Sequence, residues 1–191
     1  MEQPISREEF LTKKRDYSPL LCHLTKDDED EEHGVIFTAS ENLQQILNER
    51  KLRAFRHFCL FSEAIKNNLN ISDKFKVVCF TETPIDLINV LLSNVIGRQL
   101  KPKPYGLVFQ KSFIRFKGGN PVFYVSKQIA TPLWKMYNEQ EGKQTPDGDI
   151  CKLLALITKY DETMDFHWER EWRIVGDLEF KLVDIYCELS P

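Results

Sequence analysis

The stretch FHWEREWRI, residues 166–174, is the most informative part of the chain. Side chains alternate between the two faces of an extended strand, so Trp172 and Ile174 are expected to pack against a core. Glu169, Glu171 and Arg173 then share the other face. One interpretation is a solvent-facing edge strand with a weak Glu–Arg pair. The other is a carboxylate pair at a strand entrance facing a wet, concave surface, where one carboxylate holds a substrate hydroxyl and one stabilises a developing positive charge.

The composition is that of one globular domain. The chain has 191 residues, of which 42% are hydrophobic, so it can bury a core. The net charge of −3 argues against a protein that coats nucleic acid with its whole surface, although a local basic patch is compatible with it. No apolar run approaches the roughly 18–20 residues that span a bilayer, and the N-terminus does not resemble a signal peptide. We therefore expect a cytoplasmic protein without membrane association.

The cysteines predict neither a disulfide framework nor a metal site. There are five of them, widely spaced and without a CxxC pair, which is typical of buried free thiols in a reducing compartment. The paired Cys/His spacing of a zinc site does not occur, so no metal is expected. Cys79 has no His or Asn context that would make it a nucleophile.

Strands and helices are intermingled without regular βαβ alternation, which predicts the α+β class. A single domain is expected over residues 1–191, with a surface loop at 140–149. The acidic run at 27–33 predicts a flexible loop, because adjacent like charges repel one another and bury nothing; an acidic docking tail is the alternative. Strands are expected at 19–25, 76–81, 105–109, 121–125, 171–175 and 181–189, and helices after Thr38, after Thr83, at 133–139 and at 150–160.

Other residues carry weaker signals, each with a structural alternative. His23 lies in an apolar strand with Thr25 on the same face, and is either a structural histidine or a donor to a ligand ribose or phosphate. Thr81 and Thr83 border a helix N-terminus, which either is simply capped or attracts a phosphate. Basic residues interleaved with phenylalanines at 109–117 either hold nucleic acid or form the wet face of a core segment.

An ordered set of segments resembles the AbiGi group of bacterial abortive phage-resistance proteins. The resemblance touches most of the chain between residues 20 and 175, and AbiGi-type members have been labelled antitoxins. The segments that carry it are His23-Leu24-Thr25, residues 78–84 (VCFTETP), 105–111 (YGLVFQK), 118–125 (GGNPVFYV) and 169–173 (EREWR).

More distantly, the chain is similar to ADP-ribosyltransferases, including DarT-like toxins that modify nucleic acid. These folds carry a His or Arg on the first strand, a Ser/Thr or Tyr on a middle strand and a late E-x-E. Here His23, Thr81 and Glu169-x-Glu171 occur in that order. There is no Ser-Thr-Ser motif, and Tyr105 and Tyr124 are both candidates for the tyrosine that stacks on nicotinamide.

The resemblance implies a split, mixed β-sheet flanked by helices and an NAD-dependent ADP-ribosyltransferase acting in phage defence. Glu171 would bind the nicotinamide ribose 2′-hydroxyl and stabilise the oxocarbenium ion, and Glu169 would orient or deprotonate the acceptor. His23 would hold the adenosine-side ribose, and Arg173 would orient Glu171 or pair with the pyrophosphate. The target would be a protein or a nucleic acid, with NAD as co-substrate. The alternatives are a non-catalytic antitoxin or partner-binding module of a toxin–antitoxin pair, and a nuclease using Glu82, Glu169 and Glu171.

Overall fold

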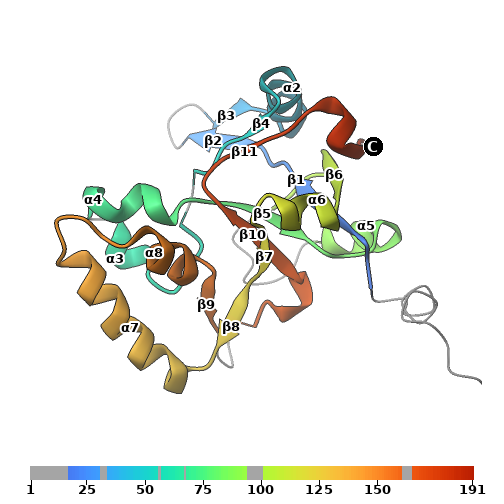
Figure 1. The fold of residues 1–191 in the computed structure, drawn as a ribbon. Helices are drawn as coiled ribbons and strands as arrows, with labels where there is room; N and C mark the ends of the chain where they lie inside the picture. The colour runs from blue at the N-terminus through green and yellow to red at the C-terminus, as the bar shows by residue number, and fades with distance from the viewer. Residues whose placement is uncertain (1–16, 31–33, 56, 67, 94–100, 161–164) are drawn as a thin grey trace, which may run out of the picture.

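A six-stranded antiparallel sheet forms the centre of the molecule (Figure 1). The computed structural model describes residues 17–30, 34–55, 57–66, 68–93, 101–160 and 165–191. The strand order is β12-β6-β1-β5-β10-β7, and every neighbouring pair is antiparallel. The strands are β1 (Leu20–Leu24), β5 (Val77–Thr81), β6 (Gly106–Gln110), β7 (Asn120–Pro121), β10 (Glu171–Val175) and β12 (Ile185–Leu189).

One face of the sheet packs against α2 (Ala39–Glu49) and α6 (Lys111–Phe116). Trp172 lies opposite Phe80 in the register of β10 and β5, and Leu21 lies opposite Phe109 in the register of β1 and β6. All four belong to the cluster of buried side chains on this face. The alternation of each strand directs these large apolar residues to one side.

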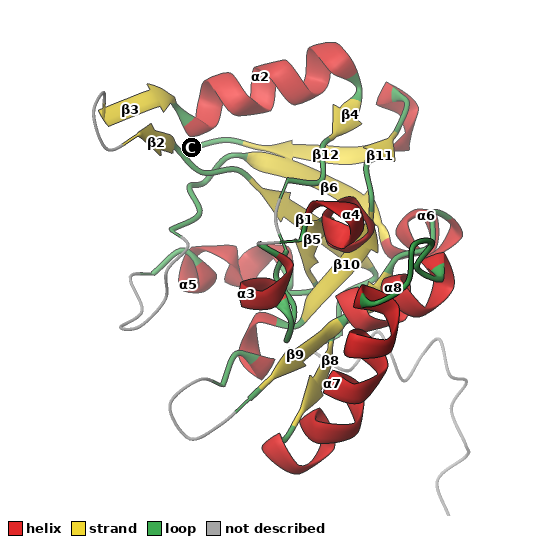
Figure 2. Cartoon of the chain, turned by 90° about the vertical axis from the view of Figure 1, so that its left-hand side faces the viewer, coloured by secondary structure: helices red, strands yellow, loops and turns green. Residues whose placement is uncertain are grey.

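The opposite face is covered by a different set of helices (Figure 2). Val77 of β5 joins a cluster with Phe61, Tyr137 and Leu154, and Cys22 and Val108 pack against Ile88 and Leu91. The helices are α3 (Ser62–Ile65), α4 (Leu69–Ser72), α5 (Ile88–Leu91), α7 (Lys127–Glu141) and α8 (Gly148–Ala155), with the 3-10 turns η1 (Asp73–Phe75) and η2 (Ile85–Leu87).

Three two-stranded pairs surround the main sheet. The strands β2 (Asp28–Asp30) and β3 (Gly34–Phe37) form a hairpin, and β4 (Lys51–Leu52) pairs with β11 (Leu178–Glu179). The parallel pair is β8 (Phe123–Val125) with β9 (Ile157–Lys159). Two further 3-10 turns, η3 (His167–Glu169) and η4 (Leu182–Asp184), precede β10 and β12.

The α+β class, with a sheet flanked by helices, is confirmed. The capping box is also present, because the Thr38 hydroxyl accepts from the Glu41 amide at 3.2 Å and the Glu41 carboxylate accepts from the Thr38 amide at 2.8 Å. A mixed sheet is expected from the sequence, but the main sheet is wholly antiparallel, and the parallel pairing occurs in the separate β8–β9 pair. In the part of the chain described here, no helix is both long and apolar enough to cross a bilayer.

Several local expectations are wrong. Asp28–Asp30, expected in a flexible loop, form the strand β2. Asp28 pairs with Lys26 and the preceding Asp27 pairs with Lys103, which reduces the repulsion between adjacent carboxylates. Residues 31–33 lie outside the described ranges. The helix α7 continues to Glu141 and α8 begins at Gly148, so the expected loop at 140–149 is shorter. The helix expected over 150–160 ends at Ala155, and its last part forms β9, which pairs with β8.

Trp172 should contribute strongly to stability. It is 4% exposed and packs within the cluster on the α2 and α6 face. The change Trp172→Ala leaves a cavity and should lower the free energy of unfolding by about 3–5 kcal/mol. Urea denaturation followed by far-UV circular dichroism measures this loss. A loss below about 1 kcal/mol would contradict the assignment of Trp172 to the core.

Candidate functional site

The candidate site lies where the chain enters β10. Arg170 adopts a left-handed conformation (φ 49°) directly after η3. This turn breaks the alternation, so Glu169 belongs to η3 and Glu171 is the first residue of the strand. The expected E-x-E arrangement on one extended strand is therefore wrong at Glu169. From Glu171 onward the alternation is as expected, with Trp172 and Ile174 in the core and Glu171 and Arg173 on the other face.

Glu171 and Arg173 form a two-point ion pair. Arg173 Nε donates to Glu171 Oε1 and Arg173 Nη2 donates to Glu171 Oε2, both at 2.9 Å. Arg173 is 2% exposed, and its Nη1 also donates to the carbonyl of Ala155 at 3.2 Å. Burial is the largest single effect and acts to lower the pKa of Arg173, but the charge of Glu171, the hydrogen bonds to it and smaller contributions from neighbouring groups together raise the pKa above its ordinary value.

Glu171 is the solvent-side member of this pair. Its side chain keeps 15% exposure, against 2% for that of Arg173. The wet, concave surroundings expected for Glu171 are therefore replaced by a largely buried ion pair at the edge of the helix-covered face. A carboxylate can accept about four hydrogen bonds; Arg173 occupies two of these positions and the Cys79 thiol a third, so one acceptor position of Glu171 is left.

Tyr124 and Cys79 are the neighbours of this pair. Arg173 lies directly opposite Cys79 in the register of β10 and β5. Burial, and then the negative charge of Glu171, raise the pKa of the Cys79 thiol, so it stays protonated and is not a nucleophile. Burial followed by Glu171 likewise raises the pKa of the Tyr124 hydroxyl, with a smaller contribution from Glu169. Tyr124 is thus the predicted tyrosine that lies near Glu171.

Tyr124 belongs to a group of aromatic side chains that also contains His167 and Tyr160. Its hydroxyl donates to the carbonyl of Phe166 at 3.1 Å, and its ring lies 4.2 Å from the ring of His167. The ring of Tyr160 lies 5.0 Å from that of His167 on another side, and Asp165 accepts a hydrogen bond from the His167 backbone amide at 3.0 Å. In the sequence, His167 stands two positions before Glu169 and four before Glu171.

His23 lies on the opposite face of the sheet from Glu171. Glu171 is opposite Thr81, and Thr81 is opposite Cys22, so these three residues share a face and His23 points to the other. There its ring packs edge-on against Phe80 at 5.8 Å. The atom Nδ1 lies 2.8 Å from the Cys79 carbonyl oxygen and must be the donor, because a carbonyl only accepts. His23 thus bridges β1 to β5 rather than facing Glu171.

The remaining predicted ligand residues have structural partners. The Thr25 hydroxyl is 2.8 Å from the Ala39 carbonyl and 3.1 Å from that of Tyr105, so it ties β1 to the start of α2 and to β6. Tyr105 packs against the cluster under α2, three strand spacings from β10. Thr81 lies beside Glu171, but its hydroxyl donates to the Glu169 carbonyl at 2.6 Å. The structure therefore gathers Glu171, Arg173, Tyr124, Glu169 and Thr81, and leaves His23, Thr25 and Tyr105 elsewhere.

A second charged cluster was not predicted from the sequence. Glu82 Oε1 accepts from Lys111 Nζ and from Arg170 Nη2, both at 2.8 Å, and Glu82 Oε2 accepts from Trp172 Nε1 at 2.8 Å. The Lys111 side chain is 5% exposed. These residues lie on the Trp172 side of β10, so Glu82 does not converge with Glu171 as a nuclease site requires. Among the described residues no group of three or more His, Cys, Asp or Glu side chains is arranged to hold a metal ion.

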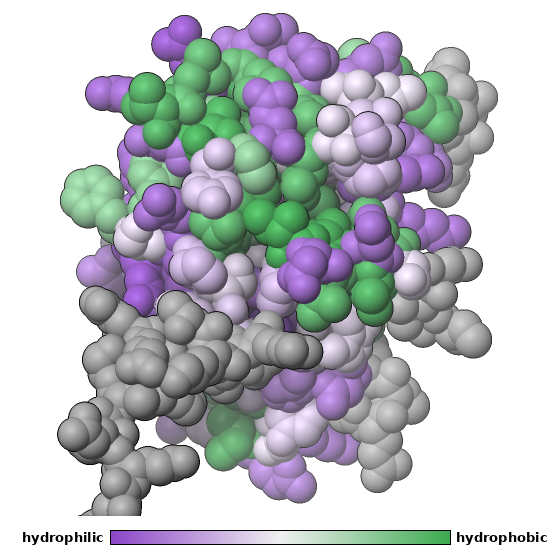
Figure 3. All heavy atoms as spheres, turned by 90° about the vertical axis from the view of Figure 1, so that its right-hand side faces the viewer, coloured by the Kyte–Doolittle hydropathy of each residue, from purple (hydrophilic) through white to green (hydrophobic). Residues whose placement is uncertain are grey.

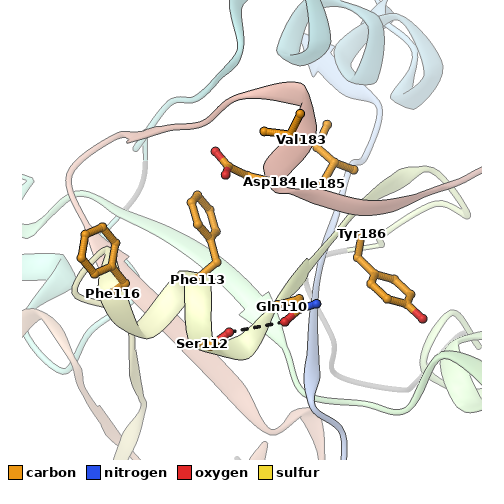
Figure 4. A pocket seen from close by; sticks show the side chains of 8 residues that line it. All are labelled: Gln110, Ser112, Phe113, Phe116, Val183, Asp184, Ile185 and Tyr186. Atoms are coloured by element: carbon orange, nitrogen blue, oxygen red, sulfur yellow. Dashed lines mark hydrogen bonds between the residues drawn. The ribbon is translucent and has the colours of Figure 1, made fainter.

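An open pocket of about 530 Å³ lies between α6 and the η4–β12 segment (Figure 4). Phe113 and Phe116 line it from α6, and Val183 and Tyr186 line it from the other side. Figure 3 shows hydrophobic side chains gathered across the middle of the face on which α5 lies. The pocket contains none of the residues of the Glu171 cluster.

Comparison with protein-family models, with curated proteins and with solved structures finds no match.

The pH dependence of stability should report on His23. Burial lowers its pKa below the ordinary 6.5, and the bond to Cys79 offsets this only in part. The unfolded chain therefore binds the proton more readily than the folded one, so this contribution to stability is complete above about pH 7 and declines as the pH falls below about 6.5. Urea denaturation between pH 5 and 7.5 should show a shallower decline for His23→Gln than for the wild type. Parallel curves would contradict a buried, neutral His23.

Removing the charge of Glu82 should be costly. In Glu82→Gln, the buried Lys111 and the partly exposed Arg170 lose their common anion, so the free energy of unfolding should fall by about 3 kcal/mol or more. The matched control is Glu179→Gln, whose carboxylate pairs with Lys51 at 3.8 Å and is 79% exposed. That variant should stay within about 0.5 kcal/mol of the wild type. Equal losses of unfolding free energy in the two variants would show that the Glu82 cluster stabilises the fold no more than an exposed ion pair does.

Proposed function

We propose that the Glu171 cluster carries out NAD-dependent ADP-ribosyl transfer, in an effector of bacterial phage defence that modifies a protein or a nucleic acid. The observation that supports this best is the position of Glu171. It opens β10, its carboxylate is oriented by two donors of a buried arginine, and Tyr124 lies beside it. The order of segments similar to those of AbiGi-type proteins and of ADP-ribosyltransferases supports the same proposal.

In this proposal Glu171 acts on the nicotinamide ribose. Its free acceptor position takes the 2′-hydroxyl, and its charge faces the oxocarbenium ion that forms as the C1′–N bond breaks and nicotinamide leaves with the bonding electrons. Arg173 holds the carboxylate in one orientation, so little reorganisation is needed in the transition state. Arg173 is thus a positioning residue, and its buried guanidinium is not available to the pyrophosphate.

Glu169 and Tyr124 have separate roles. Tyr124 offers its ring to the nicotinamide, while its hydroxyl stays bonded to Phe166. Glu169 orients the acceptor and takes its proton as the acceptor attacks C1′. His23 has no part in this mechanism because it faces the other side of the sheet, and the adenosine-side ribose must be held by other residues.

The test is nicotinamide release from labelled NAD, measured with and without a lysate of phage-infected cells. Glu171→Gln should lower turnover by about 100-fold or more, the scale of losing one electrostatic stabiliser. NAD affinity should fall less, because the charge matters most when nicotinamide departs. Glu169→Gln should impair transfer to the acceptor and keep slow NAD hydrolysis. Wild-type turnover in Glu171→Gln would contradict the proposal.

Because Glu171 is ion-paired with the buried Arg173, a second variant is needed to separate loss of catalysis from loss of folding. In Glu171→Gln the guanidinium of Arg173 loses its counter-charge, and this alone should destabilise the fold by about 3 kcal/mol or more. The double change Glu171→Gln with Arg173→Met removes both charges and should recover most of that stability. If the double variant folds and still lacks turnover, catalysis rather than folding explains the loss. If it folds and turns over NAD at the wild-type rate, Glu171 is not catalytic.

A non-catalytic antitoxin or partner-binding module is the second candidate. It is favoured by the engagement of both Glu171 oxygens with Arg173, which leaves the pair without net charge. Under this alternative, the folded double variant protects cells from phage as well as the wild type does. Under ADP-ribosyl transfer, it loses protection at equal expression.

A further inference from the structure

The β2–β3 hairpin exposes more apolar surface than a free hairpin should. It projects from the body of the molecule beside α2 (Figure 2). The three consecutive residues Val35, Ile36 and Phe37 are 52%, 52% and 48% exposed. Successive strand residues point to opposite faces, so both faces of β3 are apolar and wet. A run of three exposed apolar residues on a strand is unfavourable unless something covers it.

The edge of β3 is also open. Among the described residues β3 pairs only with β2, and the hairpin is a separate two-stranded sheet. Two-stranded hairpins are marginally stable, and a third strand with apolar side chains improves them. An edge strand of this kind is a template for an extended segment, which gains main-chain hydrogen bonds along the strand and apolar contacts beside it.

The charge of the neighbouring strand indicates what that segment contains. Six consecutive acidic residues stand at 27–32 of the sequence. Asp27 pairs with Lys103 and Asp28 pairs with Lys26, so these two lysines offset only part of this charge. Glu29 is exposed and lies opposite Val35 in the hairpin register. An approaching segment with basic side chains is attracted, whereas nucleic acid, an anionic membrane or a second copy of this acidic hairpin is repelled.

We propose that the β2–β3 hairpin is a docking site for an extended segment of another protein that alternates apolar and basic side chains and adds as a third strand beside β3. The apolar side chains of the segment lie on one face of the extended hairpin and cover Ile36. Its lysines or arginines lie on the opposite face, where their aliphatic stems cover Val35 and Phe37 and their charges lie near Glu29. This surface is separate from the Glu171 cluster, so docking does not depend on ADP-ribosyl transfer.

The test uses the full chain and two labelled heptapeptides. One alternates lysine with valine and isoleucine, and its twin has glutamate in place of lysine. Fluorescence anisotropy should show saturable binding of the basic peptide, at least about tenfold weaker binding of the acidic twin, and loss of affinity as salt rises. Hydrogen exchange should show new protection at alternate amides of β3, those that point away from β2, when the basic peptide is bound.

Two variants locate the binding. Ile36→Ser changes an exposed residue, so the variant should fold normally. Its affinity for the basic peptide should nevertheless fall by about tenfold, the scale of losing one buried apolar side chain. Val183→Ser changes a residue that is 86% exposed in the pocket of Figure 4 and should leave binding unchanged. Equal binding by Ile36→Ser and wild type, or equal affinity for the two peptides, overturns the proposal. Analytical ultracentrifugation provides a further check. If the wild type forms dimers that Ile36→Ser abolishes and that the basic peptide does not dissociate, the proposal is overturned, because a second copy of the chain then covers the hairpin.

Discussion

The burial of Arg173 is the constraint on which the arrangement around β10 depends. A guanidinium that is 2% exposed needs an anion and further acceptors, because an unpaired buried charge is strongly destabilising. Glu171 supplies the anion from two positions earlier on the same strand, and the Ala155 carbonyl supplies another acceptor from the end of α8. The ion pair therefore fixes the start of β10 and ties the central sheet to the helices on one face.

The other face of the same strand end is held in a comparable way. Glu82 gathers Lys111, Arg170 and the indole of Trp172, so three segments far apart in the sequence meet at one carboxylate. Between the two clusters the backbone turns through the left-handed Arg170, and the Thr81 hydroxyl anchors the Glu169 carbonyl. Glu171 is thus presented from a strand entrance that is restrained on both sides, and the proposed catalytic role would need a support of this kind.

The sequence predicted what depends on local alternation. The burial of Trp172 and Ile174, and the shared face of Glu171 and Arg173, follow from a period of two. The position of Glu169 was not predictable in this way, because the left-handed turn at Arg170 interrupts the period. The face of His23 depends on the register across β1, β5 and β10, which no local pattern encodes. Lys111 can be buried because Glu82, from another segment, pairs with it, and nothing in its own segment indicates this.

The proposed chemistry concerns the face of β10 that carries Glu171, and one structure would test it most directly. A crystal grown with saturating NAD or a non-hydrolysable analogue should show the nicotinamide ribose within hydrogen-bond distance of the Glu171 carboxylate. The nicotinamide ring should lie against Tyr124, and His23 should remain bonded to the Cys79 carbonyl on the opposite side of the sheet. A dinucleotide bound beside His23, or a Glu171–Arg173 pair that stays unchanged with no dinucleotide near it, would contradict an ADP-ribosyl-transfer site at Glu171.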